Sequence, residues 1–227
     1  MQYLVTINMS QETVTRLVSS GYVLQVFRAV QASDLAGRPL LWMSPAYSAE
    51  TDVTWNDGYD AYTSPSPITA GTQLTIGFSA AIEAGQLLEV SAGGVGEVTS
   101  AGHAGALSIL NTISTYFTCG IGGGAASSDP APFCAFPLYG NNLQRVVPLE
   151  KVLLMFSTEA LTPGTVIDDS YAVALTAYGP GLLVDVAGAT QRALSYDVND
   201  GWSGGGYNWA QQVPAGTGLV PLLIEQP

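Results

Sequence analysis

The sequence predicts a mostly β protein: a β-sandwich built from two related antiparallel β halves, with one short N-terminal helix. Thr, Val, Ser and Tyr are abundant, and charged residues make up only 11% of the chain, about half the usual share. The 26 glycines and 13 prolines divide the chain into short segments. Two segments, 74–82 and 107–121, alternate apolar and polar residues with the period of a strand that buries one face.

The N-terminal region predicts a strand, a helix and a second strand. The first strand covers residues 2–8. Ser10 is a suitable N-cap for the helix, and Gly21 is a suitable end. Three apolar residues between them have helical spacing: Val14, Leu17 and Val18. The apolar run 22–30, YVLQVFRAV, then predicts a buried strand.

The two alternating segments each predict one strand. In residues 74–82 the apolar side is formed by Leu74, Ile76, Phe78, Ala80 and Ile82. From Leu107 to Ile121 most odd positions are apolar, and most even positions are Ser, Thr, Tyr or Gly. A single strand of that length would span about 50 Å, which is long for a globular protein.

Four pairs of segments match in the same order along two parts of the chain. The pairs are 16–27 with 145–156, 39–43 with 181–185, 55–59 with 198–202, and 67–76 with 212–221. This order favours duplication of a β unit. We therefore expect residues 1–227 to form one compact β unit. Its internal pseudo-repeat consists of 1–90 and 145–227, joined by a Gly/Ser-rich strand-loop segment, 91–144.

The charge distribution excludes some partners. The formal net charge is −12, and no Lys or Arg lies between Arg38 and Arg145. Nucleic acid and anionic bilayers are therefore excluded, whereas a glycan or a neutral membrane surface is compatible. The N-terminal residues lack the features of a signal peptide, and no apolar run reaches the length of a membrane helix. We expect a soluble protein that is cytoplasmic or released without a signal sequence.

No recognisable motif supplies a cofactor, a metal site or a catalytic group. Cys119 and Cys134 flank a Gly/Ser/Pro-rich loop and form either one disulfide or two free thiols. With His103 as the single histidine, no usual zinc site can form, and DVNDG (197–201) lacks the spacing of an EF-hand. Nucleophile, phosphate-binding and dinucleotide motifs are absent. We expect no metal, no cofactor and no enzyme activity.

The candidate binding residues surround the two Asn-Asp-Gly sequences. This tripeptide is typical of tight hairpin turns, but the aromatic residues beside it favour a binding role. Exposed rings next to carboxylates and amides suit the apolar face and the hydroxyl groups of a sugar. The sequence therefore predicts a non-catalytic, lectin-like protein that binds a glycan or a glycan-bearing surface. The predicted ligand-binding residues are Trp55, Asn56, Asp57, Tyr59 and Tyr62 in the first group, and Asn199, Asp200, Trp202, Tyr207 and Trp209 in the second.

Two other interpretations follow from different features. Residues 91–128 are rich in small residues and include the alternating segment, as in the inserting hairpin of a pore-forming toxin. The alternative function is therefore a membrane-active toxin or defence protein, insecticidal or cytolytic, in which 91–128 rearranges. The third interpretation of the function is a structural protein that assembles as a homo-oligomer, because the small number of charged residues favours packing between copies.

Overall fold

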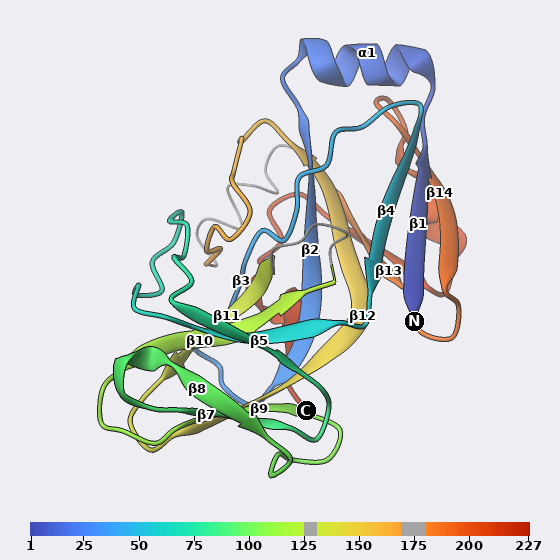
Figure 1. Cartoon of the computed structure of the whole chain (residues 1–227). Coiled ribbons are helices and arrows are strands. Elements are labelled where there is room, and N and C mark those ends of the chain that lie inside the picture. The colour runs from blue at the N-terminus through green and yellow to red at the C-terminus, as the bar shows by residue number, and fades with distance from the viewer. Residues whose placement is uncertain (125–130, 169–179) are drawn as a thin grey trace.

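The computed structural model describes residues 1–124, 131–168 and 180–227, and it is mostly β (Figure 1). A four-stranded sheet, sheet A, has the order β15 (Gly201–Trp202), β14 (Gln191–Asp197), β1 (Gln2–Asn8) and β4 (Glu50–Asn56). A five-stranded sheet, sheet C, has the order β3 (Arg38–Pro39), β11 (Pro132–Leu138), β10 (Phe117–Gly123), β5 (Tyr59–Ser64) and β6 (Phe78–Ile82). Both sheets pack through the same apolar core, in the manner of a β-sandwich.

The remaining strands form sheet B, whose longest members are β2 (Val23–Ala32) and β12 (Leu143–Ser157). Its main path has the order β16 (Ala210–Val213), β13 (Gly181–Asp185), β12, β9 (Leu107–Asn111), β7 (Leu87–Val90) and β8 (Gly96–Thr99). β2 pairs with β12 and with β17 (Ile224–Glu225). The short helices are α1 (Gln11–Ser19), α3 (Val220–Leu223) and the 3-10 turns η1 (Ala92–Gly94) and η2 (Ser203–Gly206).

The N-terminal prediction is confirmed. β1 covers residues 2–8, and the Ser10 hydroxyl caps α1 by accepting a hydrogen bond from the Thr13 N–H. Gly21 follows the helix with a φ of 74°. β2 is buried on both faces, because its even positions join the main core and its odd positions join a second cluster with α3. That environment explains the continuous apolar run in the sequence.

The prediction of one strand over 107–121 is wrong. The segment forms β9 and β10, which belong to different sheets. The break occurs at buried Asn111. Its Nδ2 donates to the carbonyls of Thr115 and Leu138, and its Oδ1 accepts from the Ile113 N–H. These side-chain bonds replace the ladder and turn the chain.

The strand predicted over 74–82 is shorter, because only β6, residues 78–82, joins the ladder of sheet C. Its partner β5 pairs as far as Thr63↔Phe78 and ends at Ser64. Pro65 comes next and has no N–H to continue the pairing.

The matched sequence segments fold differently in at least two places. Residues 16–27 span part of α1 and the first half of β2, whereas 145–156 lie entirely in β12. The first Asn-Asp-Gly sequence connects β4 in sheet A to β5 in sheet C, whereas the second closes the β14–β15 hairpin. Gly201 has a φ of 77°, and Gly58 does not have a positive φ. The shared letters therefore encode two different turns. Part of the second half, 169–179, lies outside the described residues.

Candidate functional site

The two predicted binding turns lie at opposite ends of the central strand β1. Gln2 pairs with Asn56, so the first turn follows at the start of β1. Asn8 pairs with Ser195, so the second turn follows at the end of β1. Seven residues of strand separate the two ends by about 20 Å. The structure therefore provides two separate sites, and it does not bring the ten predicted residues together.

At the first turn, the expectation of exposed rings is wrong for Trp55 and Tyr62. Trp55 is 2% exposed because β4 points Thr51, Val53 and Trp55 toward the core. Its ring stacks on Tyr3 at 5.3 Å between ring centroids. Tyr62 is 1% exposed, and its hydroxyl donates to the Cys134 carbonyl. Both rings stabilise the fold.

The other residues of the first turn are more accessible. Asn56 and Asp57 are exposed and Tyr59 is half-buried. The Asn56 side chain accepts a hydrogen bond from the Gly58 N–H, and Asp57 contacts the Met1 ammonium at 2.7 Å. Trp55 and Asn56 line a pocket of about 300 Å³ that we call the β4 pocket, together with Gln2, Thr54 and Gly124.

At the second turn, the carboxylate of Asp197 organises the backbone. It accepts hydrogen bonds from the Asn199 N–H, the Asn199 amide and the Thr13 hydroxyl. These bonds, led by the Asn199 N–H, hold the pKa of Asp197 below its ordinary value. Arg16 of α1 also donates to the Asn199 side chain. The turn is therefore fastened to the helix, while Asn199 and Asp200 remain exposed.

A pocket of about 490 Å³, lined by both polar and apolar residues, opens beside this turn, and we call it the β14 pocket. Its predicted members are Asp200 and Trp202. The sequence analysis missed the others, among them Asn8, Ser10, Ser195, Tyr196 and Ser203, because β1, α1 and β14 reach the pocket from distant parts of the chain. Alternation along β14 was the available signal, since it places Ser195 and Asp197 opposite buried Leu194.

Trp202 lines this pocket, but its ring is not an exposed platform. Trp202 is 3% exposed, which corrects the prediction for this residue. Its ring stacks on Phe156 at 5.6 Å and meets Tyr196 edge-on at 4.8 Å, while its N–H donates to the Pro180 carbonyl. Tyr196 is half-buried and also lines the pocket.

Tyr207 and Trp209 form a separate surface stack. Their rings are parallel within 10° at 4.5 Å, and the Arg192 guanidinium lies 4.9 Å from the centre of the Trp209 ring. Tyr207 is exposed and Trp209 is half-buried. Arg192 is at the start of β14 and the β14 pocket is at its end, so the stack is a second aromatic surface about 15 Å away along the strand.

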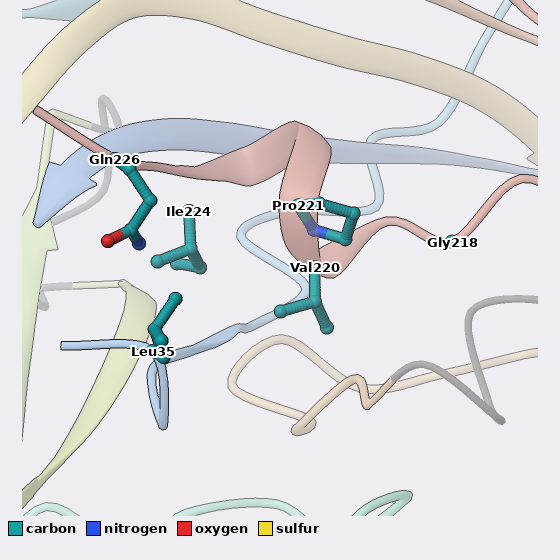
Figure 2. Close-up of a pocket in the computed structure, with 6 residues that line it drawn as sticks. All are labelled: Leu35, Gly218, Val220, Pro221, Ile224 and Gln226. Atoms are coloured by element: carbon teal, nitrogen blue, oxygen red, sulfur yellow. The ribbon is translucent and has the colours of Figure 1, made fainter. Parts of the chain in front are cut away.

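A third pocket, of about 510 Å³, is mainly apolar. Figure 2 shows Leu35 facing Ile224, with Val220 and Pro221 of α3 beside them. Gln226 is the polar side chain among its lining residues. The pocket contains none of the predicted ligand-binding residues. It also lacks the convergent polar groups that orient a sugar.

Cys119 and Cys134 are free thiols on the neighbouring strands β10 and β11. Both are fully buried, and burial raises the pKa of each thiol, to about 12 for Cys134. β10 is buried at every position and pairs with both β5 and β11. Rearrangement of the segment 91–128 would break both ladders. Residues 125–128 of that segment lie outside the described part of the chain.

Among the described residues, no group of three or more His, Cys, Asp or Glu side chains is placed to hold a metal ion. Within the same ranges, no helix has both the length and the apolar character needed to cross a membrane. Comparison of the chain with models of protein families, with curated proteins and with solved structures found no match.

Proposed function

We propose that the protein binds a glycan in the β14 pocket without altering it chemically. The observation that carries this proposal is the composition of the pocket wall. The pocket is lined by half-buried Tyr196, by exposed Asp200, and by the hydroxyl-bearing residues Ser195 and Ser203. A ring packs on the apolar face of a pyranose, and the oxygens exchange hydrogen bonds with its hydroxyls.

The rigidity of the pocket supports this proposal. Two of its lining residues, Tyr196 and Trp202, are held by ring contacts with each other and with Phe156. The hydroxyl of Ser203 accepts a hydrogen bond from the Ser195 N–H, which ties η2 to β14. A site that is already ordered loses less conformational entropy when a ligand binds. The volume of about 490 Å³ is in the range of small-ligand sites.

The protonation state of the pocket favours binding over hydrolysis. A glycosidase needs one carboxylic acid with a raised pKa to protonate the leaving group. The shifted carboxyl of the β14 pocket, Asp197, has a lowered pKa and is occupied by three hydrogen bonds. The carboxylate of Asp197 therefore stays ionised, and its hydrogen bonds stabilise the turn. Asp60, whose pKa is raised by burial, belongs to β5 in sheet C and does not line this pocket.

The experiment is a glycan array followed by calorimetric titration of the best ligand. We expect wild-type protein to bind at least one glycan and Asp200→Ala to weaken that binding at least ten-fold. Hydrogen bonds to charged groups contribute about 1.5–3 kcal/mol each. The control is Glu97→Ala, which removes an exposed carboxylate from β8 in another sheet and should leave affinity unchanged. Wild-type protein that binds no glycan, or equal affinity of the two variants, would refute the proposal.

A further inference from the structure

Arg28 is a buried positive charge without an acidic partner among the described residues. It lies in the middle of β2 and is 1% exposed. The described ion pairs involve the Met1 ammonium, Arg16 and Lys151, but not Arg28. Burial lowers the pKa of the guanidinium, only partly opposed by Tyr59 and Asp57. In a chain with 6 basic and 18 acidic residues, a basic side chain placed here needs an explanation.

The surroundings of Arg28 satisfy only part of its bonding capacity. The guanidinium carbon lies 4.7 to 5.3 Å from the ring centres of Phe133, Trp42 and Tyr59. Nη2 donates to the Tyr59 hydroxyl at 3.2 Å. Nε and Nη1 are buried, and none of the described residues forms a hydrogen bond with them. Two donors of a charged group are therefore left for something else to bind.

Gly124 borders both this guanidinium and the β4 pocket. It lines the pocket, and a Cβ atom added to it would lie 2.6 Å from Nη1 of Arg28. Because the residue is glycine, it adds no side chain where the buried Nη1 and the pocket lining approach each other. The field of a charge in a low-dielectric interior is weakly screened over such distances.

The described residues that line the β4 pocket offer hydrogen-bond donors and include no carboxylate. Gln2, Thr54 and Asn56 contribute amide and hydroxyl groups. Trp55 also lines the pocket, and its indole N–H is a further buried donor for which the described residues supply no partner. Arg28 and Trp55 thus hold unpaired, buried donors close to the residues that line the β4 pocket. Hydrogen-bond donors around a positive charge are the groups that bind an oxyanion.

We infer that the β4 pocket binds an oxyanion group, a carboxylate or a sulfate or phosphate group, with Arg28 providing the charge beneath it. This site is separate from the β14 pocket, since the two lie at opposite ends of β1. The amides of Gln2 and Asn56, which are exposed and directly opposite each other in the β1–β4 ladder, receive the anionic group, and the buried guanidinium behind Gly124 attracts it. The two proposals are independent of each other. If no glycan binds at the second turn, the oxyanion inference is unaffected, and if no oxyanion binds in the β4 pocket, the proposed glycan site is unaffected.

The test follows the indole N–H signal of Trp55 by NMR. The chain has 4 tryptophans, and Trp55→Phe identifies the Trp55 signal by its loss. Sodium sulfate, sodium phosphate and sodium acetate are titrated separately, with sodium chloride at equal ionic strength as reference. We expect a saturable shift with at least one oxyanion and none with chloride. The anion that saturates at the lowest concentration identifies the preferred group.

Two variants of exposed glutamines decide whether the signal comes from this pocket. Gln2→Glu places a like charge in the pocket wall and should weaken oxyanion binding at least ten-fold. Gln11→Glu makes the same change of net charge on α1, beyond the other end of β1, and should have no effect. Arg28→Met should abolish saturation, and if this variant does not fold, the glutamine pair decides alone. A Trp55 signal that responds equally to chloride, equal affinities of the two glutamine variants, or saturable binding in folded Arg28→Met would overturn the inference.

Discussion

Replacement of Arg28 by Met is expected to stabilise the protein. Three rings near the guanidinium contribute about 1 kcal/mol each, and the bond to the Tyr59 hydroxyl contributes about 2 kcal/mol. Against these, two unpaired N–H groups cost about 4 kcal/mol, and residual dehydration of the charge costs several more. Met is an apolar side chain that packs well against aromatic rings. The balance predicts a gain of about 2 kcal/mol.

Thermal and guanidinium-induced unfolding measure this change. For a chain of 227 residues, about 2 kcal/mol corresponds to a Tm increase of about 4–8 °C. Arg145→Met is the matched control, because Arg145 is exposed on β12, and its stability should change by less than about 0.5 kcal/mol. If Arg28 were paired with a buried anion, its loss would destabilise the protein by about 3–5 kcal/mol. A fall in Tm of that size would refute the reasoning and show that the charge is compensated.

Three further outcomes follow from the structure. Ellman's reagent should label neither cysteine in the native protein, because both thiols are buried and have raised pKa values. After unfolding without reductant, the reagent should label two thiols. An absence of labelling in the unfolded protein would indicate a disulfide. Gly120→Ala should prevent folding, since its Cβ would lie 1.9 Å from the Cys134 carbonyl oxygen, whereas Gly206→Ala, with open space around it, should leave circular dichroism and Tm unchanged. Because the pKa of Asp197 is lowered, its hydrogen bonds stabilise the protein above about pH 4, and this stabilisation is lost as the pH falls through the folded-state pKa. The Tm difference between wild type and Asp197→Asn should therefore disappear at low pH. A Tm difference that grows on acidification would contradict this assignment.

Local patterns in the sequence were enough to predict the first three elements. β1, α1 and β2 each have a signal contained within about ten residues: alternation or an apolar run for the strands, and a capping serine for the helix. The prediction failed where a single side chain or a distant partner decides the structure. Asn111 ends β9 through its own hydrogen bonds, and β6 is limited by Pro65, which follows its partner strand.

The candidate sites were only half predictable for the same reason. Aromatic residues beside Asn-Asp-Gly marked both regions, but the position of Trp55 in an alternating strand already placed it on the buried face. The β14 pocket depends on β1 lying parallel to β14, a pairing between residues at the two ends of the chain. Arg28 was missed although it left a signal, an arginine within the apolar run 22–30.

The long strand β12 also has a consequence for the order in which the protein can be made. Its partner β2 precedes it by about half the length of the chain, and the separation in sequence between the paired strands β1 and β14 is even larger. During synthesis on the ribosome, the apolar residues of β2 are added well before those of β12, the strand that pairs with it. Pairing between strands that are far apart in the sequence slows folding and leaves intermediates that expose apolar surface and tend to aggregate. We therefore expect chaperones or slow growth at low temperature to raise the yield of folded protein.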